Sequence, residues 1–86
     1  MSEDIFRDKI RAEIVRLLVE ERKLRRISGN SLAEKAGLSQ ALISSLETVP
    51  WNPTLNTLLR IGDALEVDIG ELISKARREV LKKHAK

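Results

Sequence analysis

Apolar residues recur at intervals of three and four residues along most of this chain, which is the spacing of one face of an α-helix. The first such stretch predicts one long helix from Glu3 to about Leu24. Its buried face is expected to carry Phe6, Ile10, Ile14, Leu17 and Leu18. Ser2 is suited to cap this helix, because its hydroxyl can accept a hydrogen bond from a free backbone N–H group. Acidic residues follow in the first turn, where the helix dipole favours negative charge.

Two short helices joined by a tight turn are predicted next. The first begins at Ser28 or Asn30 and buries a stripe formed by Leu32, Ala33 and Ala36. Gly37 is expected to end it, because glycine adopts the left-handed conformation without a steric penalty from a Cβ atom. The two alanines are small enough to let the two helices cross closely.

The second short helix is expected from Ser39, its N-cap, to about Thr48, with Leu38 as the apolar plug of the preceding turn. Its buried stripe comprises Leu42, Ile43 and Leu46. This arrangement indicates a helix-turn-helix, in which the second helix enters the major groove of DNA. The same pattern is compatible with a small helical bundle that has no role in DNA binding, since a fold does not fix a function.

Two more helices complete the predicted fold. Thr54 is the expected N-cap of the fourth helix, which has Gly62 at a close approach to a neighbour and ends at Glu66-Val67. Its apolar side comprises Leu55, Leu58, Leu59, Ile61 and Leu65. Asp68 and Glu71 form a capping box for the fifth helix, and Val67 and Leu72 form its hydrophobic staple. The inward side of that helix comprises Ile69, Leu72, Ile73 and Ala76, with Val80 and Leu81 extending it.

The segment LAEKAGLSQALISSLE, followed by NPTLNTLLRIGDALEVDIGEL, resembles the phage repressor/Cro class of helix-turn-helix domains, also called the XRE class. The resemblance covers roughly residues 18–73 and implies an all-α, five-helix repressor-like bundle with extended first and last helices. With only 86 residues, the chain is expected to form one domain over 1–86. Residues before about 18 extend the first helix and pack on their own domain or on a partner subunit. Residues 74–86 form a basic C-terminal helix or tail.

Two positions depart from the pattern of the class. Gly29-Asn30 stands where relatives commonly carry a glutamine that contacts the DNA backbone. Val49-Pro50-Trp51 follows Glu47, where a glycine is usual. Trp51 has three interpretations: a cover for the edge of the core, a dimer contact, or a contact with the sugar–phosphate backbone.

Composition excludes several other classes of protein. The chain has no cysteine, which rules out disulfides, thiolate metal sites and a cysteine nucleophile. His84 lies among lysines near the C-terminus and is expected to be a solvated surface group. No catalytic triad, glycine-rich phosphate loop or metal-ligand cluster appears, so we predict no enzymatic activity, no cofactor and no metal. No signal peptide or apolar run of transmembrane length appears, which predicts a soluble, cytoplasmic protein with no membrane partner.

Charge is distributed unevenly within the formal total of +3. Residues 1–27 carry +2, residues 28–73 carry −4 and residues 74–86 carry +5. Affinity for DNA depends largely on neutralising phosphates, so the acidic helix-turn-helix region needs cations from its flanks. The cluster from Arg22 to Arg26 is the first candidate. The basic tail is either a solvated helix, an arm that reaches phosphate, or an interface helix that uses Val80.

The predicted base-reading residues are Gln40, Ala41, Ser44 and Ser45, which occupy the outward face of the second short helix. The resemblance places Gln40, Ala41 and Ser45 where relatives usually touch base edges. Glutamine can bind N6 and N7 of adenine, an alanine methyl can pack on a thymine methyl, and serine reads either strand weakly. Small uncharged residues on an exposed helix favour a face that fits against DNA over one that fits against protein.

DNA backbone contacts are expected from Arg22, Arg25, Arg26, Ser28, Asn30, Ser39 and Asn52. The arginines are equally compatible with a solvated last turn of the first helix, where cations suit the helix dipole. The resemblance also implies a structural ion pair between Arg22 and Glu47, which would tie the first and third helices together.

The resemblance implies a sequence-specific transcriptional regulator, acting as a homodimeric repressor on double-stranded DNA. Its operator would be a palindrome with half-sites about one helical turn apart. The alternative is a protein-binding module of the same fold, such as an antitoxin or an anti-repressor partner. It would grip a toxin or another protein through the long first helix or the basic tail. An antitoxin of this class often binds its own operator, so the two functions can coexist.

Overall fold

The fold is taken from a computed structural model that describes residues 3–47 and 52–83, with only the main chain of Glu47. The elements, in order, are α1 (Glu3–Leu24), α2 (Gly29–Ala36), α3 (Gln40–Ser44), the 3₁₀ turn η1 (Ser45–Glu47), α4 (Leu55–Leu65) and α5 (Ile69–Lys83). No strand occurs in this part of the chain, so the predicted all-α class is confirmed. The predicted roles of Ser2, Thr48, Trp51 and His84 fall outside the described residues.

α1 is the longest element and has the predicted bounds. Its 22 residues span about 33 Å, most of the 40 Å long axis of the molecule. The C-terminal part of α1 lies among the other helices, where Ile14, Leu17 and Leu18 are buried. Phe6 and Ile10, toward the N-terminus, are only half-buried. The predicted apolar stripe is therefore present, but its side chains are less buried toward the N-terminus.

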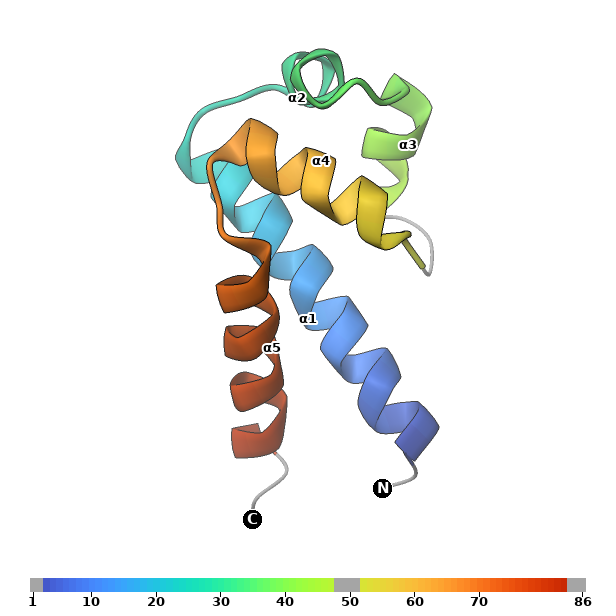
Figure 1. The fold of residues 1–86 in the computed structure, drawn as a ribbon, viewed down its shortest axis with the longest axis vertical. Helices are drawn as coiled ribbons and strands as arrows, with labels where there is room; N and C mark the ends of the chain where they lie inside the picture. Colours follow the sequence, from blue (N-terminus) through green and yellow to red (C-terminus); the bar gives the residue numbers. More distant parts are fainter. Residues whose placement is uncertain (1–2, 48–51, 84–86) are drawn as a thin grey trace.

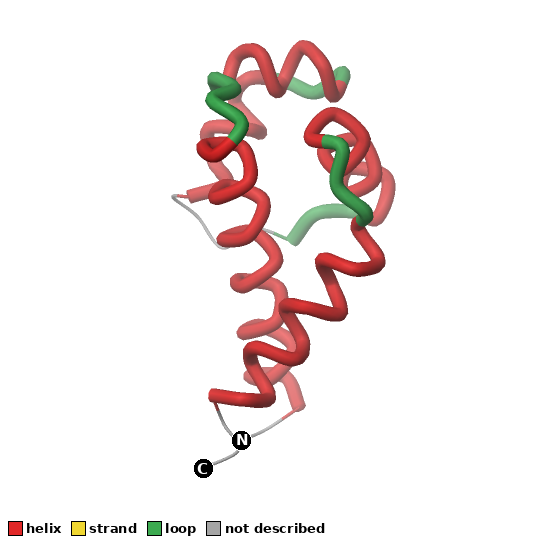
Figure 2. Tube along the Cα trace, turned by 90° about the vertical axis from the view of Figure 1, so that its left-hand side faces the viewer, coloured by secondary structure: helices red, strands yellow, loops and turns green. Residues whose placement is uncertain are grey.

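The molecule has two regions, which we call the head and the stem (Figure 1). The head comprises residues 17–65: the C-terminal part of α1, then α2, α3, η1 and α4. The stem comprises the N-terminal part of α1, residues 3–16, together with α5, which packs along it. Figure 2 shows that the start of α1 and the end of α5 lie at the same end of the stem, away from the head.

A single core of aliphatic residues joins the two regions. Leu18, Leu32, Ile61 and Leu65 are its most completely buried side chains. Gly62 in α4 lets α5 approach closely, as predicted, because a Cβ atom there would lie 2.5 Å from Cγ1 of Ile69. Such a distance is incompatible with packing, so a glycine is required at this contact between α4 and α5.

The predicted caps of the last two helices are present. Thr54 accepts a hydrogen bond from the Thr57 N–H group at 3.1 Å, at the start of α4. Asp68 accepts one from the Glu71 N–H group at 3.1 Å, at the start of α5. Val67 is half-buried and Leu72 is buried, as expected for a hydrophobic staple. Each of these boundaries was set by residues within one helical turn.

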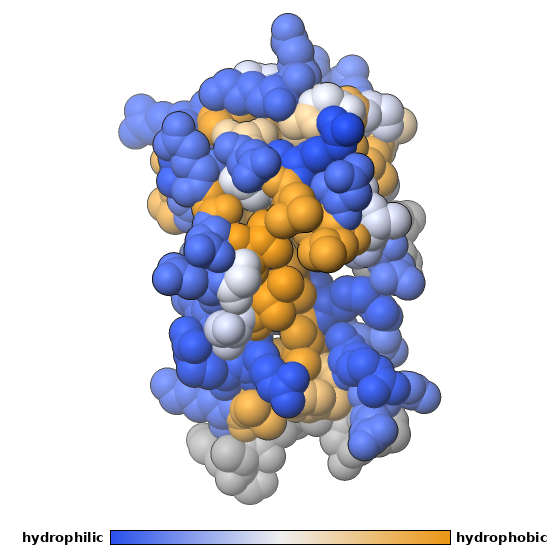
Figure 3. Space-filling model, viewed as in Figure 1, coloured by the Kyte–Doolittle hydropathy of each residue, from blue (hydrophilic) through white to orange (hydrophobic). Residues whose placement is uncertain are grey.

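Two residues of α4 differ from the sequence prediction. Leu55 is 64% exposed and Leu59 is 46% exposed, although both were assigned to the apolar side of this helix. They lie one turn apart, beside rather than on the row that contacts the core. Figure 3 shows an apolar band on this side of the molecule, running from α4 down between α1 and α5.

A buried carboxylate lies within the stem. Glu13 in α1 is 7% exposed and accepts hydrogen bonds from Nε and Nη2 of Arg16 at 3.0 and 2.7 Å. These hydrogen bonds lower the pKa of Glu13, against the opposing effect of its burial. The positive charges of Arg16 and of two α5 lysines lower it further. The pKa of Arg16 is raised in return.

Within residues 3–47 and 52–83, every helix is too short or too polar to cross a lipid bilayer. The same described residues contain no group of three histidine, aspartate or glutamate side chains arranged to hold a metal ion.

Candidate nucleic-acid interface

The two helices of the helix-turn-helix are fixed by local hydrogen bonds that the sequence predicted. The Ser28 hydroxyl accepts from the Ser31 N–H group at 3.1 Å and caps α2. The Ser39 hydroxyl accepts from the Leu42 N–H group at 3.1 Å and caps α3. Both caps have extended backbone, as an N-cap requires.

The turn between α2 and α3 depends on Gly37. It has φ 67° and ψ 35°, the left-handed conformation predicted for this position. The N–H group of Gly37 donates to the carbonyl of Glu34 at 3.3 Å, and that of Leu38 donates to the carbonyl of Ala33 at 2.9 Å. Carbonyls at the end of α2 are thereby satisfied, and the chain turns directly into the cap of α3.

A long-range contact reinforces this turn and was not predicted. Arg60, in α4, donates from Nη1 to the carbonyl of Ala36 at 3.3 Å. A Cβ atom on Gly37 would lie 2.8 Å from the same nitrogen. Glycine is therefore favoured here by its conformation, and a side chain at this position would also make the Arg60 guanidinium move. The two partners are 24 residues apart in sequence, so local pattern gave no signal for the contact.

α3 is shorter than predicted. The expected helix ran from Ser39 to about Thr48, whereas the α-helix spans Gln40–Ser44 and tightens into the 3₁₀ turn η1. Ile43 and Leu46 are buried as predicted, but Leu42 is only half-buried. Because this segment has one α-helical turn followed by a 3₁₀ turn, fewer of its side chains face the core than in a regular helix of ten residues.

The predicted base-reading residues divide into two groups. Gln40, Ala41 and Ser44 are exposed on α3. The Ser44 hydroxyl donates to the carbonyl of Ala41 at 3.1 Å and stays at the surface. Ser45 differs from the prediction, because it lies in η1, is half-buried and donates to the carbonyl of Leu42 at 2.7 Å. The exposed face of α3 is therefore made of one amide, one methyl and one hydroxyl.

A shallow hollow of about 270 Å³ lies beside this face, between α1, α2 and α3. Four of the predicted contact residues line it: Arg22, Asn30, Gln40 and Ser44. Its floor is apolar and includes Val19, Ile43 and Leu46. The structure thus brings one cation and three uncharged polar side chains together on one side of the head.

Arg22 is partly committed to the protein itself. It is half-buried and donates from Nη1 to the carbonyl of Ile27 at 2.8 Å, which fixes the link between α1 and α2. The predicted ion pair between Arg22 and Glu47 falls outside the described residues, because it depends on the Glu47 side chain.

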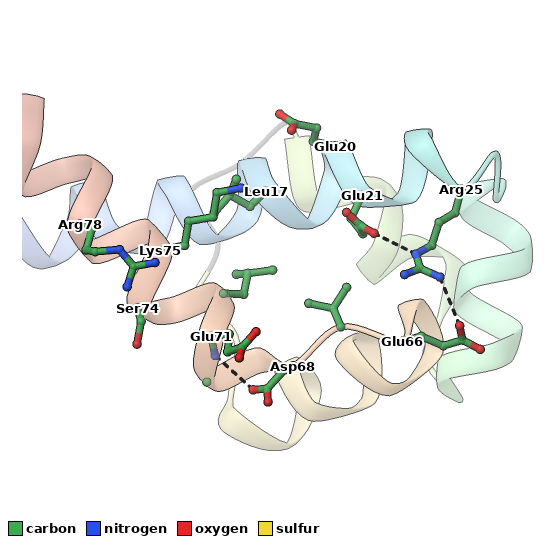
Figure 4. Close-up of a pocket in the computed structure, with 13 residues that line it drawn as sticks. Leu17, Glu20, Glu21, Arg25, Glu66, Asp68, Glu71, Ser74, Lys75 and Arg78 are labelled. Atoms are coloured by element: carbon green, nitrogen blue, oxygen red, sulfur yellow. Dashed lines mark hydrogen bonds and ion pairs between the residues drawn. The ribbon is translucent and has the colours of Figure 1, made fainter.

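Arg25 lies apart from the other predicted backbone contacts. Its guanidinium donates to Glu21 at 2.9 Å and to Glu66 at 3.3 Å (Figure 4). This pairing lies in a second hollow, of about 930 Å³, between α1 and the α4–α5 junction. The acidic residues that line this hollow are Glu20, Glu21, Glu66, Asp68 and Glu71. The structure therefore does not bring Arg25 together with the α3 face.

The remaining predicted backbone contacts are exposed. Arg26 follows α1 with φ 57°, and Asn52 precedes α4. Ser28 and Ser39 are exposed as well, although their hydroxyls act as caps. α3 carries no charged residue, so electrostatic attraction to an anion depends on residues around it.

Comparisons with known proteins agree with this geometry. A family model described as a Cro/C1-type HTH DNA-binding domain matches residues 18–75. The chain is also similar to a protein of Bacillus phage phi105 called immunity repressor protein, with 33% identity over 54 residues. That alignment covers 63% of this chain and 38% of the phage protein, so the chain spans well under half the length of this relative. No solved structure matches the chain significantly.

Proposed function

Because this chain belongs to the family of Cro/C1-type helix-turn-helix DNA-binding domains, we propose that it is a homodimeric repressor that reads a palindromic operator with α3. Its family makes it a DNA-binding regulator, and the likeness to a phage immunity repressor supports repression as the outcome. We further propose that residues 1–86 form a single domain without enzymatic activity. The observation that carries this proposal is the exposed, uncharged face of α3 beside a hollow lined by Arg22 and Asn30.

Readout of bases follows from the chemistry of that face. The Gln40 amide offers a donor and an acceptor that match N7 and N6 of adenine. The Ala41 methyl suits contact with a thymine methyl, and the Ser44 hydroxyl can bind either strand. All three side chains are short or flexible, so α3 can lie deep in the major groove. Both serine hydroxyls donate to a backbone carbonyl, but Ser45 is assigned a weaker role because it is half-buried, whereas Ser44 is exposed.

Phosphate contacts are assigned to the residues that flank α3. Arg22 and Arg26 supply positive charge at the end of α1, and Asn30 is exposed in the first turn of α2. Free N–H groups at a helix N-terminus also favour a phosphate, so the starts of α2 and α3 contribute through Ser28 and Ser39. Asn52 adds a contact from the segment before α4. Arg25 contributes only if DNA displaces the carboxylates that hold it.

The length of α3 supports a dimer. Five residues span about 7.5 Å, and base pairs are stacked about 3.4 Å apart, so one copy of α3 covers only two or three base pairs. Such a short site is not specific by itself. Two copies related by a twofold axis would read two half-sites about one helical turn apart, which gives a palindrome.

Selection from a random duplex library tests this proposal. We expect the purified protein to enrich a palindrome, and Gln40→Ala to relax the preference at one position in each half-site. The loss should be about 1–3 kcal/mol per mismatched contact, measured by fluorescence anisotropy on the selected duplex. Ser44→Ala should weaken binding less than Gln40→Ala, because a single hydroxyl discriminates poorly between bases.

Ser74→Ala is the matched control for Ser44→Ala, since Ser74 is an exposed helical serine on α5. It should leave operator binding unchanged. Enrichment of no palindrome, or equal weakening by the two serine substitutions, would refute base reading by α3. A monomeric complex in analytical ultracentrifugation, with one half-site sufficient for full affinity, would refute the dimer.

A further inference from the structure

The basic half of α5 lies at the end of the molecule opposite the helix-turn-helix. α5 leaves the head at Ile69 and runs along α1 to Lys83, away from α2 and α3 (Figure 1). The long axis measures 40 Å, and the last turns of α5 lie at its far end. These last turns and α3 therefore lie toward opposite ends of the molecule.

The cations of the two stem helices differ in their partners. On α1, Arg7 pairs with Asp4 at 2.6 Å, and Arg11 pairs with Asp8. Arg16 pairs with Glu13 and Glu20. In the described part of α5, none of the cations forms a salt bridge. These cations are Lys75, Arg77, Arg78, Lys82 and Lys83.

Three of these α5 cations form a row. Lys75, Arg78 and Lys82 follow one another at intervals of three and four residues, so they share one helical face. Like charges at this spacing repel each other along a helix. Ser74 and Leu81 are also exposed, and Leu81 shows 48% of its surface although it is a large apolar residue. Residues 75–83 therefore carry five cations against one carboxylate, Glu79, and are basic overall. Lys75 and Arg78 also line the acidic hollow beside Arg25.

An apolar hollow adjoins this surface between the two stem helices. It has a volume of about 230 Å³ and is lined by Lys9, Ala12, Glu13, Arg16, Val80 and Lys83. Ala12 and Val80 provide apolar surface, and Lys9 and Lys83 bring positive charge from the two sides. The one carboxylate, Glu13, is already hydrogen-bonded by Arg16 and so does not neutralise the two lysines by a direct ion pair.

We propose that this stem surface, defined as residues 75–83 of α5 with the hollow beside Lys9, binds an acidic amphipathic helix of another protein. Complementary charge would steer such a helix to the unpaired cations, and its apolar side chains would enter the hollow beside Val80. The proposal is independent of operator reading, because it uses none of the residues around α3.

Charge distinguishes an acidic helix from two other occupants of this surface, a second copy of this chain and a nucleic acid. A second copy that paired symmetrically through α5 would bring two rows of unpaired cations together, which is unfavourable. A nucleic acid would neutralise the cations through its phosphates but would leave the apolar hollow without a partner. An acidic helix with one apolar face satisfies both features of the surface.

A designed peptide tests the proposal directly. The probe is a fluorescein-labelled peptide of glutamate, alanine and leucine, about 18 residues or five helical turns long, with leucines three and four residues apart. We expect saturable binding by fluorescence anisotropy that weakens as salt is raised. A scrambled peptide of the same composition should bind at least about tenfold more weakly, because it presents no apolar face.

Arg78→Gln/Lys82→Gln should weaken binding of the amphipathic peptide about tenfold or more. Arg7→Gln/Arg11→Gln is the matched control, because it removes the same charge from exposed but ion-paired positions on α1 and should change binding little. Far-ultraviolet circular dichroism melts of both variants verify that each is folded. The selected operator should bind both variants as it binds the parent protein, so failure of the stem surface is distinguishable from failure of α3.

Three results would overturn the proposal. If the scrambled peptide binds as tightly as the amphipathic peptide, the surface binds polyanions in general and does not recognise an apolar helix face. Equal loss in the two double variants would show that only net charge matters. Displacement of the peptide by a duplex of unrelated sequence, at the affinity of the peptide itself, would assign the surface to nucleic acid instead.

Discussion

The head and the stem use charged residues in opposite ways. In the head, the exposed face of α3 has no charge, and the two nearest caps are serines. In the stem, α1 pairs its arginines internally, whereas the basic face of α5 has no salt bridge among the described residues. A face that fits into a groove requires small side chains, and a face that attracts a charged partner requires unpaired ones.

The comparison also separates the basic segment from the candidate base-reading face. α5, which carries most of the basic C-terminal segment, belongs to the stem, whereas α3 lies in the head. Under the two proposals, the basic stem surface does not serve DNA binding. The predictions below test, from the largest expected effect to the smallest, how far the two regions are independent.

Leu32→Ala should cause the largest loss of stability. Leu32 is 1% exposed in α2, and truncating a buried leucine costs about 2–5 kcal/mol of unfolding free energy. We expect urea denaturation followed by circular dichroism to show a single transition at lower urea. Leu81→Ala is the stem control and should change stability by less than about 0.5 kcal/mol, because Leu81 is 48% exposed. Two separate transitions would show that head and stem do not share one core.

Gly37→Ala should have the next largest effect. A residue with a Cβ atom loses about 1–2 kcal/mol in the left-handed conformation, and here it would also displace Arg60. Thermal melts of Gly37→Ala, Arg60→Ala and the double variant form a thermodynamic cycle. We expect a non-additive result, since the Cβ atom and the guanidinium compete for one space. Strict additivity would contradict the packing role of this glycine.

Glu13→Gln should destabilise the stem by about 1 kcal/mol near neutral pH, because it removes a charged partner of Arg16. The pKa of Glu13 is lower in the folded protein than its ordinary value of 4.5. Its ionised form therefore adds stability that is fully present above pH 4.5 and is lost as the pH falls through the folded pKa.

Urea denaturation from about pH 7 to about pH 3 tests this linkage. The difference in unfolding free energy between the parent protein and Glu13→Gln should shrink in acid. Glu34→Gln, at an exposed position of α2, is the head control and should change stability little at neutral pH. A difference that stays constant over the whole range would mean that the ionised carboxylate does not stabilise the stem.

Arg78→Gln/Lys82→Gln should produce the smallest change in stability, and in the opposite direction. Removing like charges four residues apart on α5 should raise the unfolding free energy by about 0.2–0.5 kcal/mol. Arg7→Gln/Arg11→Gln breaks two exposed ion pairs on α1 and should lower it slightly. Differential scanning calorimetry at low salt resolves the two signs. A loss of stability in the α5 variant would show that these cations stabilise the fold itself.

Local signals predicted most of the helical framework. The bounds of α1, the caps at Ser28 and Ser39, and the left-handed Gly37 all followed from residues within one turn. The end of α3 was not predictable in this way, because its change to a 3₁₀ turn depends on the position of η1 against α1. For the same reason, Ser45 is half-buried in η1, although it was predicted to lie on the outward face of the helix.

Contacts between distant segments were beyond the sequence. Arg25 reaches Glu66 across 41 residues, and Arg60 reaches the Ala36 carbonyl across 24. Leu55 and Leu59 fit the apolar pattern of α4 yet are exposed, because the other helices cover only part of that side. Such outcomes depend on how many neighbours pack against a face, which periodicity alone does not specify.

The sequence by itself determined the bounds of α1, the N-caps of the later helices, and the turn that joins α2 to α3. These features depend on backbone hydrogen bonds and side-chain size within a few residues. Only the tertiary structure decided that Arg22, Asn30, Gln40 and Ser44 share one hollow. It also decided that the basic half of α5 lies at the opposite end of the molecule, since the packing of α5 along α1 sets its direction.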